Sequence, residues 1–138
     1  MEKYQMDEEE VQEFLDKTRM LISKGNNVQI NNKPWSGNRV NKTLAYMAET
    51  GITKKDIERV ICELQVSNYS YTADDRNENF KNEKVWIFGI TKKLIDEEEN
   101  FYIKLKIRFI EDEMLLVMSF HPEVLTVNNR KLEFPYAE

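Results

Sequence analysis

One stretch of the chain carries, at a regular spacing, groups that could handle a phosphate. Over residues 101–110 apolar and polar residues alternate, and the polar positions are Tyr102, Lys104, Lys106 and Arg108. In an extended strand every second side chain points to the same face, about 6.7 Å from the next, so three cations and one phenol would line that face. This geometry could follow the phosphates of single-stranded RNA, whose bases stack on aromatic rings. The same pattern also fits the ordinary solvated face of a half-buried sheet.

The only histidine lies where it could complete this set. His121 ends the apolar run of residues 114–121, and a turn at residues 111–113 separates that run from the alternating one. If the two runs pair as an antiparallel hairpin, His121 returns to the neighbourhood of Tyr102. An imidazole titrates near neutral pH and can take or give a proton. A histidine held by a local hydrogen bond at a strand end is the equal alternative.

The chain has few of the residues that other catalytic chemistries need. The chain has one cysteine, one histidine and four glycines, too few for a zinc set of histidines and cysteines or for a glycine-rich phosphate loop. Asp74, Asp75 and Glu78 could in principle bind a cation, but a polar stretch of this composition is more typical of a solvated loop. We therefore expect neither a metal site nor a cofactor.

The elements that must position these groups begin with three predicted helices. Apolar residues recur there at spacings of three and four, over residues 7–25, 40–50 and 56–64. Capping residues or glycines mark their ends, namely Asp7, Gly25, Gly51 and Thr53. The second helix is expected to turn Leu44, Met47 and Ala48 inward. Residues 26–38 predict a loop.

After Leu64 the apolar spacing falls to two, which is typical of strands. The predicted strands are residues 66–71, 85–90, 101–110 and 114–121, with a short edge strand at 132–134. Residues 72–83 predict a long polar loop. The residues expected to pack under the helices are Phe101, Ile103, Leu105, Ile107 and Phe109. The predicted fold class is α+β, with N-terminal helices packed on a C-terminal antiparallel β-sheet in a single domain, residues 1–138.

The charge pattern bears on partners and on location. The net charge is −5, but the acidic runs 7–10 and 96–99 hold eight of the 25 acidic residues, leaving 20 bases against 17 acids elsewhere. The runs are expected to be solvated, and a docking surface for a basic partner is the alternative. No apolar leader precedes Glu10, and no run approaches the roughly 18 apolar residues of a membrane span. We expect a cytoplasmic protein with no membrane partner.

An ordered set of short patterns resembles a known family. The set consists of Thr53-x-x-Asp56-Ile57-x-x-Val60-Ile61-x-x-Leu64, Val85-Trp86-Ile87-Phe88, Tyr102-Ile103-Lys104-Leu105-Lys106-Ile107 and Ser119-Phe120-His121. In this order, over about residues 8–121, they resemble the motility quorum-sensing regulator (MqsR) family of toxins. These are small messenger RNA endoribonucleases with a RelE-like fold. A tail of about residues 126–138 extends beyond the short family members.

The resemblance implies a toxin of a type II toxin–antitoxin system that cleaves messenger RNA without a metal. Its partner would be a cognate antitoxin protein encoded by a neighbouring gene. Tyr102 matches the family's catalytic tyrosine, and His121 stands where the best-known members have a lysine. The family glutamine after the tryptophan falls on Ile87, and the family lysine before the long loop falls near Ser70 or Tyr71.

These matches lead to an assignment of roles. His121 is assigned to proton transfer, Lys104 to phosphate stabilisation and Tyr102 to orientation or protonation of the leaving group. The residues assigned to RNA binding are Lys106, Arg108 and Tyr71. The competing interpretation is a non-enzymatic module that binds RNA or protein with the same basic stripe. A third is a purely protein-binding surface at the sheet edge or at the loop holding Trp35.

Overall fold

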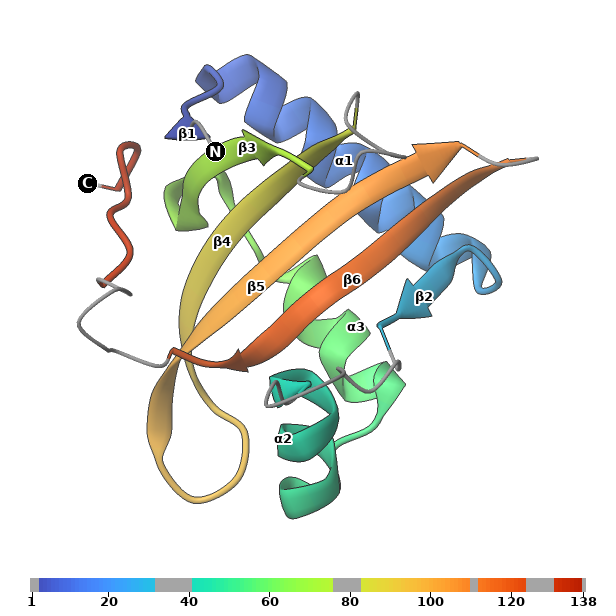
Figure 1. The fold of residues 1–138 in the computed structure, drawn as a ribbon, viewed down its shortest axis with the longest axis vertical. Coiled ribbons are helices and arrows are strands. Elements are labelled where there is room, and N and C mark those ends of the chain that lie inside the picture. Colours follow the sequence, from blue (N-terminus) through green and yellow to red (C-terminus); the bar gives the residue numbers. More distant parts are fainter. Residues whose placement is uncertain (1–2, 32–40, 76–82, 110–111, 124–130, 138) are drawn as a thin grey trace.

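The computed structural model describes residues 3–31, 41–75, 83–109, 112–123 and 131–137. Its elements are β1 (Lys3–Tyr4), α1 (Glu8–Lys24), β2 (Val28–Ile30), α2 (Lys42–Thr50), α3 (Lys54–Cys62), the 3₁₀ turn η1 (Val66–Asn68), β3 (Tyr69–Asp74), β4 (Lys84–Lys93), β5 (Glu98–Phe109) and β6 (Glu113–Pro122). The strands form one sheet in the order β1-β3-β4-β5-β6-β2, with the helices on one side (Figure 1). Among the described strands, only β2 and β6 pair in parallel; the other neighbours are antiparallel. The predicted α+β class is confirmed.

Local capping chemistry sets the ends of the helices. The Asp7 carboxylate accepts a 2.8 Å hydrogen bond from the backbone N–H of Glu10 at the start of α1. At the start of α3, Thr53 and Asp56 form a reciprocal capping box. Gly25 and Gly51 follow α1 and α2 with positive φ angles of 89° and 77°, a region that favours glycine. The predicted helix boundaries are therefore confirmed to within a few residues.

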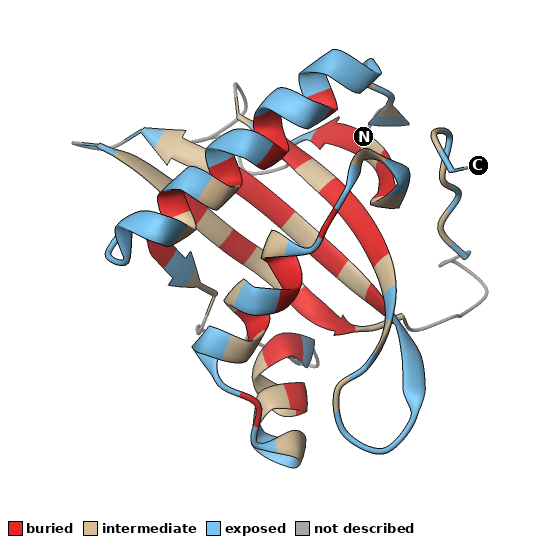
Figure 2. Cartoon of the chain, turned by 180° about the vertical axis from the view of Figure 1, so that it is seen from behind, coloured by how far each residue is buried: buried red, intermediate tan, exposed pale blue. Residues whose placement is uncertain are grey.

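The core lies between the sheet and the helices, and Figure 2 shows buried residues along the strands that the helices cross. Phe101, Ile103 and Leu105 of β5 are fully buried there, as the alternation predicted. On β4, Trp86 stacks on Phe14 of α1 with ring centroids 4.3 Å apart. The prediction is wrong for Phe109, the last residue of β5, which is 74% exposed. Because alternate residues of a strand point to opposite faces, the polar side chains of β5 lie on the other face of the sheet, which we call the outer face.

Three local predictions are wrong. The predicted loop 26–38 contains β2, which pairs in parallel with Leu115–Val117 of β6. The predicted strand at 66–71 begins as the 3₁₀ turn η1, and its strand continues to Asp74 inside the predicted loop. Residues 132–134 form no strand, although they do lie against the sheet. Distant segments decide the first case, whereas the η1 turn is held locally, since Asn68 Oδ1 accepts a 2.9 Å hydrogen bond from the backbone N–H of Gln65.

The buried face of α2 also differs from the prediction. Thr43 and Tyr46 are buried, whereas Ala48 is exposed. A contact at the edge of the sheet accompanies this burial of α2, where β2 ends at Ile30 opposite Val117. Beyond that point the N–H of Phe120 needs another acceptor, and it donates to Thr43 Oγ1 over 2.9 Å. Tyr46 then meets Phe101 edge-on, with ring centroids 5.6 Å apart.

Candidate functional site

Tyr102 and His121 lie side by side on the outer face of the sheet. The antiparallel register of β5 and β6 pairs the two residues directly. Their rings stack with centroids 5.5 Å apart and planes inclined by 21°. The expectation that the hairpin returns His121 to Tyr102 is thus confirmed. A phenol and an imidazole in contact can share the delivery and removal of a proton.

The surroundings of His121 select its neutral form. The side chain is 9% exposed, and its Nδ1 lies 2.8 Å from the carbonyl oxygen of Pro122. A carbonyl oxygen only accepts hydrogen bonds, so we place the proton on Nδ1, which leaves the lone pair on Nε2. Burial lowers the pKa of His121 most, and the charge of Lys42 adds to this, against the opposing hydrogen bond to Pro122. A neutral imidazole with its lone pair on Nε2 suits a general base.

This protonation state can be measured directly, because the chain has a single histidine. In an NMR titration the midpoint of His121 is expected below its ordinary value of 6.5, and Lys42→Met should move it upward. Between the folded pKa and the unfolded value of about 6.5 the folded state binds fewer protons. The contribution of His121 to stability should therefore be complete above pH about 6.5 and fall below it. A midpoint at or above 6.5 would contradict the assigned environment.

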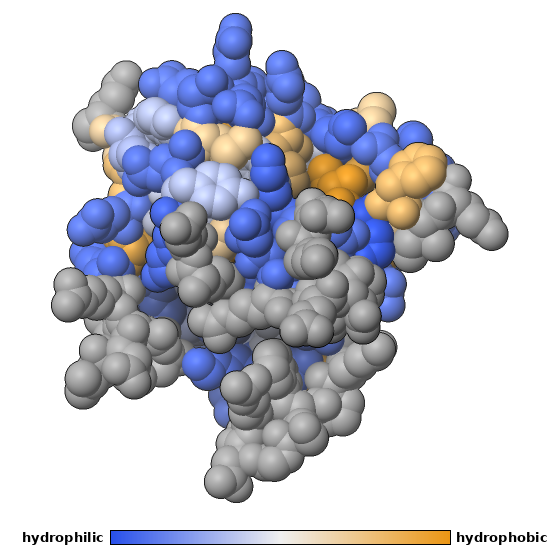
Figure 3. All heavy atoms as spheres, turned by 45° about the horizontal axis from the view of Figure 1, so that its top comes forward, coloured by the Kyte–Doolittle hydropathy of each residue, from blue (hydrophilic) through white to orange (hydrophobic). Residues whose placement is uncertain are grey.

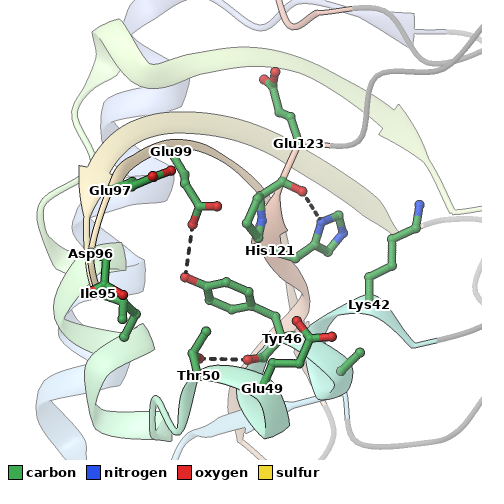
Figure 4. A pocket seen from close by; sticks show the side chains of 12 residues that line it. Lys42, Tyr46, Glu49, Thr50, Ile95, Asp96, Glu97, Glu99, His121 and Glu123 are labelled. Carbon is green, nitrogen blue, oxygen red and sulfur yellow. Dashed lines mark hydrogen bonds between the residues drawn. The ribbon is translucent and has the colours of Figure 1, made fainter.

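A cavity of about 600 Å³ opens beside His121 (Figure 4). His121 and Lys42 lie on one side of it, and Asp96 and Glu97 lie on the other. The carboxylates that line the cavity are Glu49, Asp96, Glu97, Glu99 and Glu123. Burial, followed by the charge of Glu99, raises the pKa of the Tyr46 hydroxyl, which lies 3.5 Å from that carboxylate. This acidic lining disfavours a phosphate inside the cavity itself.

Lys104 and Tyr71 share the next row of the outer face. The register aligns Tyr71 with Ile87, Ile87 with Lys104, and Lys104 with Ser119. Lys104 therefore lies one row from the Tyr102–His121 pair, while Tyr71 lies two strands away from Lys104. The Nζ of Lys3 stands 4.7 Å from the centroid of the Tyr71 ring, a cation–π contact. Of the predicted cations, Lys104 is the one beside the ring pair.

Lys106 and Arg108 are engaged by acidic residues. The Lys106 side chain is 2% exposed, and its Nζ forms ion pairs with Asp75 and, at 2.8 Å, with Glu83. The Arg108 guanidinium binds Glu83 through Nε and Nη2, at 3.0 to 3.2 Å. The expectation that Lys106 stands on a wet face is wrong. The reason is that Asp75 and Glu83, which a backbone hydrogen bond of 2.9 Å joins, close over the end of β5.

Two of the positions where the family pattern departs, Ile87 and Ser70, carry no titratable group. Ile87 is 1% exposed and packs with Ala73 and Val85 in a small apolar cluster of the outer face. Ser70 is 3% exposed, and its hydroxyl donates to the carbonyl oxygen of Glu133 over 2.6 Å. Both side chains therefore contribute to packing.

Sequence reasoning missed Lys42 and the residues that cover the sheet from the C-terminus. Lys42 faces His121 from α2, and no local pattern marks it. For the contact of the C-terminal residues with β4 a signal existed, since Gly89 interrupts an apolar strand, which often marks a close approach of another segment.

Figure 3 shows hydrophilic side chains prevailing on one side of the molecule, with apolar groups in small patches.

Comparison with known proteins yields no relative. No protein-family model matches the chain, and no curated protein or solved structure matches it significantly. Within the residues described, no group of three or more histidine, cysteine, aspartate or glutamate side chains is placed to hold a metal ion. None of the described helices is long and apolar enough to cross a bilayer. The RelE-like assignment stays a prediction from the resemblance.

Proposed function

We propose that this protein is an endoribonuclease that cleaves single-stranded messenger RNA without a metal, using the Tyr102–His121 pair. One observation carries the proposal, namely the stacked phenol and imidazole on adjacent strands, with centroids 5.5 Å apart. Lys104 supplies a cation in the neighbouring row. A base, an acid and a cation are the groups that cleavage by the RNA's own 2′-oxygen requires.

Each group has one step in the proposed reaction. The Nε2 of His121 takes the proton of the ribose 2′-hydroxyl, and the 2′-oxygen attacks the adjacent phosphorus. The ammonium of Lys104 stabilises the negative charge on the phosphorane oxygens. The bond from phosphorus to the 5′-oxygen then breaks, and the Tyr102 hydroxyl gives its proton to that oxygen. The products are a 2′,3′-cyclic phosphate and a 5′-hydroxyl.

Electrostatics constrain the direction from which RNA approaches. The cavity beside His121 is lined by five carboxylates and one lysine, so the phosphate is placed on the Lys104 side of the imidazole. The RNA then crosses the outer face of β5, where Tyr102 can stack with a base. This path uses neither Lys106 nor Arg108, whose charges meet Asp75 and Glu83.

The biological role in this proposal is that of a cytoplasmic toxin. The resemblance to the MqsR family supports it, through the ordered patterns that end at Tyr102 and at His121. A ribonuclease that acts on the cell's own messenger RNA has to be restrained. The proposed partner is therefore an antitoxin protein encoded by a neighbouring gene.

Cleavage in the presence of excess chelator tests the proposal. Fragments are expected with a 2′,3′-cyclic phosphate on one side and a 5′-hydroxyl on the other, because the nucleophile is the 2′-oxygen. A polynucleotide kinase should label the 5′-hydroxyl without prior phosphatase treatment. The matched control is the same sequence with 2′-deoxyribose throughout, which should stay intact. Cutting of the deoxy strand, or ends with a 5′-phosphate, would rule the mechanism out.

The second candidate function is a non-enzymatic module that binds RNA or protein. Within this candidate, the ion pairs of Lys106 and Arg108 favour a protein partner over RNA, since they reduce the positive charge open to a phosphate backbone. The apolar Ile87 at a family catalytic position favours the non-enzymatic function. Tight RNA binding with no fragment under any condition would select this function.

A further inference from the structure

Gly89, in the middle of β4, holds a place open on the outer face of the sheet. A Cβ added at this residue would lie 2.8 Å from Cζ of Phe134 and 3.0 Å from Cδ1 of Leu132. The φ angles of Gly25 and Gly51 are positive, but that of Gly89 is not, so its backbone conformation is open to any residue. A larger residue at this position would therefore require the Phe134 and Leu132 side chains to shift. Gly89 leaves a notch into which the ring of Phe134 fits.

The notch is in line with the proposed catalytic pair. The register pairs Gly89 with Tyr102 and Tyr102 with His121. The three residues form one row across β4, β5 and β6, and Phe134 occupies the end of that row. Leu132 packs on the neighbouring apolar cluster, against which Tyr71 and Tyr102 also pack. The C-terminal residues thus cover the platform on which an RNA base would stack beside Tyr102.

The covering segment, residues 131–137, is held by side chains. Leu132, Phe134 and Tyr136 are half-buried, and the residues between them are exposed. Hydrogen bonds connect it to the rest of the molecule from Ser70 Oγ to the Glu133 carbonyl (2.6 Å) and from the Tyr136 hydroxyl to the Met6 carbonyl (2.5 Å). The Tyr136 ring stacks on Tyr69 at 6.0 Å.

Such a segment can leave without unfolding the sheet. In Figure 1 the segment runs beside the sheet as irregular chain. Its residues belong to no described strand pairing. Segments with few buried side chains and no ladder bonds open at low free-energy cost. The sheet and the catalytic row would remain as they are when the segment departs.

We propose that residues 131–137 are an intramolecular cover that competes with single-stranded RNA, with Phe134 holding the place of a nucleobase in the Gly89 notch. The inference rests on the proposed function for the identity of the competing ligand. A flat aromatic ring and a nucleobase present the same kind of surface for stacking. The protein therefore binds RNA only in the fraction of molecules whose cover is open.

Two variants separate release of the cover from access to the notch. Phe134→Ala empties the notch, whereas Gly89→Ala fills it with a methyl group that displaces the Phe134 ring and so weakens docking of the cover. Binding is measured by fluorescence anisotropy with a labelled 2′-O-methyl oligonucleotide, which cannot be cleaved through its 2′-oxygen. If the cover is closed about nine-tenths of the time, Phe134→Ala should raise the apparent affinity about tenfold. Gly89→Ala should give no such gain. Phe109→Ala, which removes an exposed ring elsewhere, is the matched control and should bind as the parent does.

Opening of the cover is measured independently of RNA. Gly89→Ala leaves the C-terminal sequence unchanged, so trimming by a carboxypeptidase can be compared directly with the parent chain by mass spectrometry. Faster trimming in Gly89→Ala is expected, and equal rates would overturn docking of the segment. Equal RNA affinity in Phe134→Ala and the parent would overturn the competition. Absence of RNA binding in both would overturn the proposed function and the competition together, and the trimming rates would still decide whether the segment docks.

Discussion

Replacement of His121 by asparagine is expected to lower the rate of RNA cleavage by roughly 10²–10⁴-fold, the usual effect of removing a general base. The asparagine amide can still donate a hydrogen bond toward the Pro122 carbonyl, which lies 2.8 Å from Nδ1 in the parent. It has no nitrogen that titrates. The variant therefore removes proton transfer while keeping the local contact, and the rate is measured on a labelled RNA in excess chelator.

Two further substitutions make this result interpretable. His121→Ala should lose the same activity and some stability as well, because the ring is nine-tenths buried and its removal leaves a cavity. Met20→Ala, on the exposed side of α1, should keep the parent rate. Cleavage by His121→Asn at the parent rate would eliminate His121 as the proton acceptor.

The second large effect concerns stability, at Lys106. Lys106→Ala is expected to lower the free energy of unfolding by about 3 kcal/mol, since it removes the buried cation that pairs with Asp75 and leaves Glu83 with Arg108 alone. Chemical denaturation measures the change. Lys55→Ala, on the exposed face of α3, is the control and should stay within about 0.5 kcal/mol of the parent.

The pH dependence of unfolding checks the same ion pairs. The hydrogen bond from Arg108 is the largest cause that holds the pKa of Glu83 below its ordinary 4.5, and Lys106 adds to it. A carboxyl whose folded pKa is lowered contributes stability above its unfolded pKa, and this is lost as pH falls through the folded value. In Lys106→Ala that loss below pH about 4.5 should be smaller. A variant as stable as the parent would show that these charges contribute little.

The cations that alternate along β5, Lys104, Lys106 and Arg108, thus have different roles. Lys104, beside Tyr102 and His121, stays in the proposed catalytic group. Lys106 acts on the fold, because its charge ties the ends of the segment between β3 and β4 to β5 through Asp75 and Glu83. A loss of RNA binding in Lys106→Ala would therefore need to be separated from its loss of stability.

The sequence by itself determined the local elements and one part of the site. Helix ends followed from Asp7, Thr53 and the two glycines at the ends of α1 and α2, because caps act within one turn of the chain. The alternation in residues 101–110 determined which side of β5 faces the helices, since the period of a strand is two. The hairpin connects strands adjacent in sequence, so the meeting of Tyr102 and His121 could be predicted as well.

Only the tertiary structure decided the contacts between distant segments. Lys106 meets Glu83 across 23 residues, and Ser70 meets Glu133 across 63. The parallel pairing of β2 with β6 also joins distant segments. Beyond the end of β2 the backbone N–H of Phe120 donates to the Thr43 hydroxyl, and Thr43 lies on the buried face of α2. The physical reason is that periodicity and caps report on neighbours along the chain. A buried charge, an edge strand or a covering segment depends on groups that only folding brings together.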